Sequence, residues 1–385
     1  VFGHLLLVLG FFFNATATTR ISTLSLHDAL PIWGRRHVLP SGKAESFFDE
    51  LGIAGYFKHR LLWDLMTTSL PKWLKSPPDI LLFADLFAGP GSYGRPSASL
   101  QQLLKVSKPP EFDVLLGSPL LPLLRLAKYE GLDIACLRIG EKQKKRLIAC
   151  LCEEDAGLLD ALRVAVPPIA DELRSRGIHP QIHLSPKAFP DSLDVIDDCI
   201  RRRGHTAGLV FADPFGFQTL GDMEALLRRL SGTRVDVLFT WMSSSYGRLT
   251  SGPGKQRLCK VLGVASPPRS EAAGMQAFVE SLEAPTSWRA RYAWMPNALA
   301  TKAHRWAPWY RLLYFSENPA GLEAFLDAAG RGLSTVKEIA SSDGQLAFGF
   351  DGGSELLTWL SHWAQEALTA NGMSWSEFSS RVLDI

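Results

Sequence analysis

The 385-residue sequence predicts an α/β protein, a three-layer αβα sandwich with a largely parallel central sheet. The main observation is that short, continuously apolar runs alternate with segments of helical periodicity, which is the pattern of βα units. A second observation is that three of these runs stop abruptly at a glycine-rich or acidic turn. They are residues 79–87, 147–152 and 207–212, and a parallel sheet buried on both faces requires strands of this kind.

The composition is that of an ordinary globular protein with one large domain or two small ones. Apolar residues make up 46% and charged residues 21% of the chain, which excludes collagen-like, coiled-coil and wholly disordered classes. A net charge of +2 does not indicate nucleic-acid binding. This balance is still compatible with a local basic patch. Five cysteines without a CxxC pair argue against a disulfide scaffold or a zinc site. We therefore expect a cytoplasmic protein without a bound metal.

The first 32 residues are set apart from the fold. Residues 23–32 read TLSLHDALPI and match the conceptual translation of a sequencing adapter, so we interpret residues 1–32 as an assembly artefact. The alternative is a secretory leader, because residues 1–13 are apolar. That run lacks a basic start and is too short to span a bilayer, so we expect no membrane contact.

The remaining chain divides into three predicted parts. Residues 33–78 form a helical entry segment that is interrupted at Gly52 and Gly55 and closed by prolines. Residues 79–330 form the main domain, and residues 331–385 form a helical C-terminal extension. The expected strands of the main domain are 79–87, 147–152, 181–184, 207–212, 235–240, 290–296 and 309–315, with helices after residues 120 and 155 and at 221–230 and 321–329; segment 251–290, rich in Gly, Pro, Ser and Ala, is expected to be a long loop or insertion.

A glycine-rich loop follows the first strand, with Gly89, Gly91 and Gly94 in the spacing GxGxxG. The match is weak alone, but its place after a buried strand strengthens it, because ligands of open α/β sheets bind beyond the carboxyl ends of strands. A dinucleotide favours a helix that begins inside such a loop, and here Pro96 delays any helix. S-adenosylmethionine has no phosphate and needs only close backbone approach and an acid at the next strand end.

Glu153 stands where that acid is expected, directly after the second strand. The competing interpretation is a solvated acid in the first turn of a helix, where a negative charge complements the macrodipole. Position alone does not decide between the two interpretations.

The motif Asp213-Pro214-Phe215-Gly216 ends the strand at 207–212. The Asp213 carboxylate and the Pro214 carbonyl offer two acceptors that can hold an amine toward a methyl donor, while Phe215 stacks on a planar ring. A plain strand-ending turn explains the motif equally well, since Asp and Pro are common in turns.

Other candidates have simpler interpretations. Cys150 and Cys152 are expected to be buried structural thiols on one strand face. The basic runs at 142–146 and 201–203 are expected to be solvated surfaces.

Taken in order, these motifs resemble those of the three-Cys-motif partner proteins. The resemblance covers about residues 45–330. The matching pieces are the entry segment from Lys58 to Trp73, the strand end Asp85–Gly91, the turn Gly117-Ser118-Pro119, Glu153, Asp213–Gly216 and the strand at 310–315. The sequence departs from the pattern in the long separation of Gly91 from Glu153, and residues 131–147 are interpreted as an insertion.

The resemblance implies the Rossmann-like, seven-stranded fold of class I S-adenosylmethionine-dependent methyltransferases. It also implies a three-Cys-motif protein encoded nearby as partner. The acceptor amine is then expected at Asp213, Pro214 and Phe215. The implied cofactor is S-adenosylmethionine, with Asp85, Phe87, Gly89, Gly91, Ser118 and Glu153 around it.

Three functions follow as alternatives. The first is methyl transfer to an amine of an unknown substrate. The second is a non-catalytic protein that binds cofactor or partner, and the third is an NAD(P)-dependent oxidoreductase. The DLFAG string also opens DNA cytosine-5 methyltransferases, but the chain has no Pro-Cys pair to supply their nucleophile, which excludes that reaction.

Overall fold

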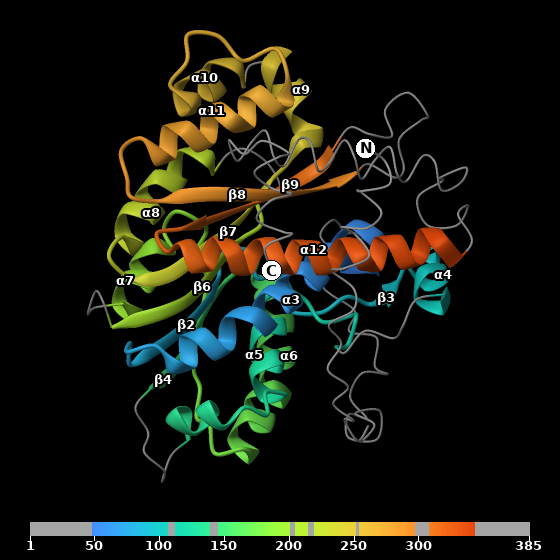
Figure 1. Ribbon diagram of the computed structural model, residues 1–385, viewed down its shortest axis with the longest axis vertical. Helices are drawn as coiled ribbons and strands as arrows, with labels where there is room; N and C mark the ends of the chain where they lie inside the picture. The colour runs from blue at the N-terminus through green and yellow to red at the C-terminus, as the bar shows by residue number, and fades with distance from the viewer. Residues whose placement is uncertain are drawn as a thin grey trace, which may run out of the picture. The chain divides into compact units, whose positions relative to one another are not determined.

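The computed structural model describes residues 48–106, 112–138, 145–200, 205–214, 219–251, 254–296 and 308–342. All of them belong to one compact unit, Leu39–Leu356. The unit is built on a seven-stranded sheet with helices on both faces (Figure 1). The predicted α/β fold class is therefore confirmed.

The sheet has the strand order β5-β4-β2-β6-β7-β9-β8. The first five strands of this order are parallel, whereas β9 is antiparallel to both β7 and β8. All seven expected strands are present. Their bounds are β2 Ile80–Asp85, β4 Arg146–Cys152, β5 Gln181–Ser185, β6 Thr206–Ala212, β7 Arg234–Trp241, β8 Arg289–Pro296 and β9 Pro308–Ser316.

The strand order contains a topological switch point between β2 and β6. From β2 the chain continues to β4 and β5 on one side, whereas β6 and β7 lie on the other side. Crossovers of opposite sense leave a crevice at the carboxyl ends of the two central strands, which is where open α/β sheets bind ligands. Every residue of β2 and β6 is buried, so the floor of this crevice is rigid.

One glycine in the sheet allows these two strands to approach closely. Gly208 of β6 pairs with Leu82 of β2 and has a φ of 148°. A Cβ at this position would lie 1.8 Å from the carbonyl oxygen of Leu82, so no other residue fits. The close approach holds Asp85 in register with Phe211, two residues before Asp213.

Four helices pack in series on one side of the sheet. In Figure 1, α12 and α3 pass side by side in front of the strands, and α5 and α6 continue that layer. Each packs through apolar residues, which cover the sheet and exclude water. Their bounds are α3 Ile53–Lys75, α5 Leu121–Ala127, α6 Ala156–Ser175 and α12 Pro319–Ser342.

The helices α7 and α8 form a second layer. Arg229 of α8 donates from Nη1 to Asp194 of α7 at 3.1 Å and also pairs with Asp197. The bounds of the remaining elements are β1 Glu50–Leu51, β3 Arg95–Pro96, α4 Ala98–Val106, η2 Leu132–Leu137, α7 Leu193–Cys199, η3 Leu220–Asp222, α8 Met223–Leu230, α9 Ser243–Ser251, α10 Lys255–Leu262 and α11 Glu271–Glu283.

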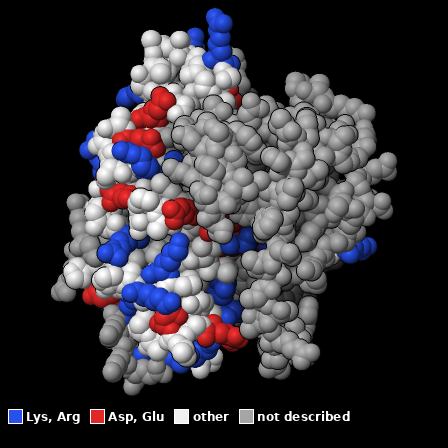
Figure 2. Space-filling model, viewed as in Figure 1, with Lys and Arg blue, Asp and Glu red and all other residues white. Residues whose placement is uncertain are grey.

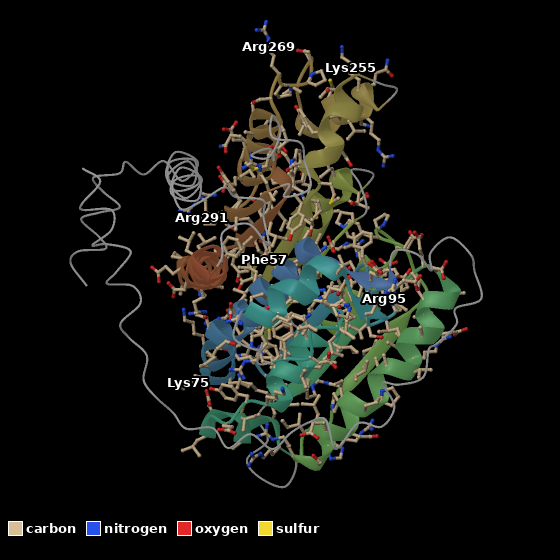
Figure 3. The ribbon with its side chains drawn as sticks, turned by 90° about the vertical axis from the view of Figure 1, so that its right-hand side faces the viewer. Phe57, Lys75, Arg95, Lys255, Arg269 and Arg291 are labelled. Atoms are coloured by element: carbon tan, nitrogen blue, oxygen red, sulfur yellow. The ribbon has the colours of Figure 1, made fainter. Side chains whose placement is uncertain are left out.

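The expectation of a long loop at 251–290 was wrong, because α10 and α11 lie within this segment. Gly263 ends α10 in the left-handed conformation, with φ 63°. Ser270 caps α11 by accepting from the backbone nitrogen of Ala273 at 3.2 Å. The glycine and serine residues that suggested a loop are therefore helix ends. Figure 3 shows Lys255 and Arg269 at the end of the unit formed by these helices, away from Phe57 of α3.

The entry segment also differs from the expectation. Gly52 precedes α3 as its N-cap, but the helix continues through Gly55 and Pro71 without a break. Packing against α5 and α12 outweighs the weak helix propensity of these two residues. At the other end, α12 runs through residue 330, and residues 343–385 of the predicted helical extension lie outside the described residues.

The described surface carries both charge signs. Figure 2 shows Lys and Arg interspersed with Asp and Glu on the face in view. No described helix is both long and apolar enough to cross a membrane.

Candidate functional site

Asp85 closes the carboxyl end of β2, and its side chain is buried there. Its Oδ1 accepts a hydrogen bond from the backbone nitrogen of Phe87 at 3.0 Å, and its Oδ2 accepts one from Ser118 Oγ at 2.7 Å. Burial raises the pKa of Asp85 to about 7, and the charges of Asp213 and Glu153 add to the rise. Asp85 therefore holds the turn at Ser118 against the strand end, and three acids converge on this edge.

The loop after β2 turns at Gly89 and Gly91, which have φ values of 58° and 80°. These angles favour glycine, as the motif predicts. Protein atoms fill the space beside both residues: a Cβ at Gly89 would lie 2.9 Å from the Phe48 ring, and one at Gly91 would lie 2.8 Å from Leu162 Cδ1. The two glycines therefore set the path of the loop through close packing.

Glu153 follows β4 and binds the loop directly, although it comes 64 residues after Gly89. Its Oε2 accepts from the backbone nitrogen of Gly89 at 2.8 Å, and its Oε1 accepts from that of Asp155 at 2.9 Å. Burial raises the pKa of Glu153. Each carboxylate oxygen has a second lone pair, so Glu153 can accept a hydrogen bond from a ligand hydroxyl while it holds the loop.

Asp213 follows β6 and is paired with a lysine far away in the sequence. Lys58 of α3 donates from Nζ to Asp213 Oδ2, and the two side chains are 14% and 23% exposed. The same ammonium lies 5.5 Å from the centroid of the Tyr310 ring. Pro214 is buried next to Asp213, whereas Phe215 lies outside the described residues. The amine-holding position predicted for Asp213 is thus taken by an amine of the chain itself.

A pocket lies at this edge, at the switch point between β2 and β6. The pocket brings together residues that the sequence places far apart, from α3, the glycine loop, the turn at 117–118 and the end of β6. The lining residues are Phe48, His59, Phe87, Ala88, Pro90, Gly91, Ser92, Tyr93, Gly117, Ser118 and Asp213.

The sequence analysis missed the aromatic side of this pocket. The ring centroid of Tyr93 lies 5.6 Å from that of Phe48 and 5.6 Å from that of His59. Phe48 reaches the loop because β1 pairs with β3, and the backbone nitrogen of Gly94 donates to Phe48 O at 2.9 Å. No motif signalled these contacts, because they depend on a two-residue sheet between distant segments.

His59 is the least expected member of the lining. It is 2% exposed, and its Nδ1 is buried without a hydrogen-bond partner in the described structure. Burial, together with the charge of Lys58, lowers the pKa of His59 to about 3, so the imidazole is uncharged at neutral pH. An uncharged imidazole offers one donor and one acceptor to a ligand.

The charge of the lining selects between the two predicted cofactors. The described lining residues include Asp213 but no Lys or Arg, and Asp85 and Glu153 lie behind them. Lys58 offsets the charge of Asp213, so the described lining offers no cationic group to a pyrophosphate. No helix begins inside the glycine loop either, since the chain passes through β3 before α4 begins at Ala98. The residues present therefore fit a sulfonium better than a dinucleotide.

Within the described residues, no group of three or more His, Cys, Asp or Glu side chains is arranged to hold a metal ion. Cys150 and Cys152 are buried, and Cys150 Sγ lies 2.9 Å from Cys199 Sγ.

Comparisons with known proteins identify no family. No family model matches the chain, and no curated protein matches it. Among solved structures, the plantazolicin methyltransferase BpumL in complex with SAH is similar with a TM-score of 0.32 and 9% identity, over 68% of this chain and 85% of that chain. A likeness of this size identifies no family, so the class of the protein follows from its own sheet order: a Rossmann-like α/β protein with a pocket at the switch point.

Proposed function

We propose that the chain binds S-adenosylmethionine in the pocket between β2 and β6 and transfers its methyl group to an amine. The observation that carries this proposal is the pocket at the switch point, in which Asp213 is the only charged residue of the described lining and no Lys or Arg lines it. S-adenosylmethionine carries a positive sulfonium, a positive amino group and one carboxylate, so it is a net cation. The pocket therefore complements the charge of this cofactor.

Each predicted residue has a separate task in the proposal. The loop at Gly89 and Gly91 presents its backbone to the amino-acid end of the cofactor, with Asp85 and Ser118 holding the loop and turn in place. Glu153 accepts from the ribose hydroxyls through its remaining lone pairs. Phe87 lines the same pocket.

Asp213 and Pro214 orient the acceptor amine, and Phe215 is proposed to stack on the acceptor. The bound cofactor supplies an activated methyl group on a good leaving group. The protein therefore needs alignment more than acid–base chemistry, and positioning is the expected source of rate.

The resemblance to the three-Cys-motif partner proteins supports two further proposals. The first is that the chain belongs to that family. The second is that it acts in the cytoplasm with a partner protein that has a three-cysteine motif and is encoded nearby. A pull-down with that neighbouring protein tests the partner. A protein that retains this interaction but binds no cofactor would match the non-catalytic alternative.

Thermal unfolding of the full chain with and without ligand tests the cofactor. At a concentration 100-fold above its dissociation constant, S-adenosylmethionine should add about 2.7 kcal/mol to the free energy of unfolding. NAD(P)H at the same concentration should add nothing. The reverse result would identify a nicotinamide enzyme and overturn the proposal.

A matched pair of glutamate variants localises the binding. Glu153→Gln should reduce the stabilisation by S-adenosylmethionine, because an amide has one acceptor atom where the carboxylate has two. Glu154→Gln, at the exposed neighbouring residue, should leave it unchanged. Equal loss in both variants, or in neither, would contradict the assignment of Glu153.

A further inference from the structure

The ion pair between Lys58 and Asp213 has an unusual position. Asp213 is the residue to which the proposed function assigns the acceptor amine, and an amine already bonds to it. The Lys58 ammonium also lies 5.5 Å from the centre of the Tyr310 ring, the geometry of a cation–π contact. A carboxylate and an aromatic face are the groups that hold a substrate ammonium.

Three features fix Lys58 in this place. Its helix, α3, is clamped between α5 and α12. Tyr310 is tied to the same helix, since its hydroxyl donates to Ala54 O at 2.6 Å. His59, the next residue of α3, lines the pocket. The Lys58 ammonium is therefore held from a rigid helix against Asp213, which lines the pocket, although Lys58 itself is not among the described lining residues.

We propose that Lys58 is itself a methyl acceptor, so that the protein methylates its own side chain at the site where its substrate amine binds. This inference rests on the proposed function, because the methyl group comes from S-adenosylmethionine. It identifies the substrate class as a primary alkylamine, of which the lysine side chain is the internal example. A neutral aromatic amine carries no charge for Asp213 and Tyr310 to hold.

The transfer balances as follows. Lys58 Nζ first loses a proton to solvent, which the like charge of a neighbouring sulfonium favours. The Nζ lone pair then bonds to the methyl carbon while the carbon–sulfur bond breaks, and its electron pair stays on sulfur. The products are a neutral thioether and a methylated lysine, which regains a positive charge and keeps its pairing with Asp213.

Incubation of the full chain with methyl-labelled S-adenosylmethionine, followed by intact-mass and peptide analysis, tests the proposal. The expected result is a mass gain of one or more methyl groups, located on Lys58. Lys58→Arg should show none, although an arginine preserves the pairing with Asp213. Lys72→Arg is the matched control on the same helix, where Nζ donates to Ala320 O at 3.3 Å on an exposed surface, and it should be labelled like the wild type.

A binding measurement gives a readout that does not depend on methyl transfer. Lys58→Met removes a positive charge beside Asp213, so it should raise the affinity for S-adenosylmethionine several-fold relative to its uncharged, demethylated product. Lys72→Met should leave this ratio unchanged. An unchanged ratio in a folded Lys58→Met protein would place the ammonium away from the sulfonium and overturn the inference.

The outcomes distinguish a failure of self-methylation from a failure of the proposed function. If the cofactor binds but Lys58 stays unlabelled, self-methylation is wrong and the proposed function stands. If labelling at Lys58 is equal in Asp213→Asn, it is non-specific alkylation and the inference also fails. If the cofactor does not bind at all, the proposed function fails and the inference fails with it.

Discussion

Two acidic side chains near the carboxyl ends of neighbouring strands have opposite surroundings. Glu271 of α11 accepts from Trp241 Nε1 at 2.7 Å, from Ser243 Oγ at 2.7 Å and from Arg311 Nη2 at 2.8 Å. Asp213 is paired with Lys58 alone among the described residues, and it lines a pocket. A carboxylate with several protein donors is structural, whereas one with a single exchangeable partner at a pocket is available to a ligand.

The difference also separates the roles of the two regions. Glu271 joins α11 to β7 and β9, so it fastens the segment containing α9 to α11 onto the sheet. Asp213 joins β6 to α3, and its pairing crosses the site. The first contact holds the fold together, and the second lies where chemistry is proposed.

The largest expected effect on stability is at Glu271, the carboxylate with several protein donors. Glu271→Ala leaves the 2%-exposed Arg311 without its carboxylate and should lower the free energy of unfolding by about 3–5 kcal/mol. Urea denaturation measures the change. Glu224→Ala breaks an exposed pair with Arg228 on α8 and should cost less than about 0.5 kcal/mol. Similar losses in both variants would show that Glu271 is only a surface acid.

The second prediction concerns the pH dependence of the free energy of unfolding that Asp85 causes. Burial raises the pKa of Asp85 from 3.8 to about 7, so between these values the folded protein holds a proton that the unfolded chain has lost. The free energy of unfolding should therefore fall as pH rises across this window, by about 1.4 kcal/mol for each pH unit from Asp85.

Asp85→Asn removes that contribution and keeps a hydrogen-bonding side chain beside Phe87 and Ser118. The difference between variant and wild type in denaturation at several pH values isolates Asp85. Burial also raises the pKa of Asp236 to about 6. Asp236 adds the same pH dependence to the free energy of unfolding of both proteins, so its contribution cancels in the difference. Parallel profiles would mean that Asp85 ionises normally in the folded state.

Among Glu271, Asp85 and Asp213, the smallest expected effect on stability is at Asp213. Asp213→Asn should change the free energy of unfolding by at most about 1 kcal/mol, because Asp213 and Lys58 keep partial contact with water. Methyl transfer should be lost, whereas S-adenosylmethionine should still bind with a lower affinity because the described lining loses its only charged residue, as measured by a labelled-methyl assay and calorimetry. Unchanged turnover would contradict the role assigned to Asp213. A large loss of stability would show that Asp213 is a structural carboxylate like Glu271.

The strands were predictable because a buried strand needs a short apolar run and little else. The run at 207–212 corresponds to β6, Thr206–Ala212, and the run at 147–152 to β4, Arg146–Cys152. The helices were harder. Pro71 predicted the end of a helix, but packing lets α3 continue through it. The turn residues on either side of α10 led us to predict a loop where a short helix lies.

The site was predictable only in part. Asp85, Ser118 and Glu153 come together because the parallel sheet aligns the carboxyl ends of its strands, and sequence order alone reveals that edge. The pairing of Lys58 with Asp213 spans 155 residues, and a helix far from the motif supplies it. Likewise, His59 has no local signal, because its lining position depends on how α3 packs.

The position of α3 has a consequence for dissecting the protein. The predicted main domain begins at residue 79, and a fragment cut there would retain every strand of the seven-stranded sheet. It would nevertheless lose Phe48, Lys58 and His59, one wall of the pocket and the partner of Asp213. The helix α3 is thus an integral component of the site, and a fragment that lacks it would keep the sheet without a complete pocket.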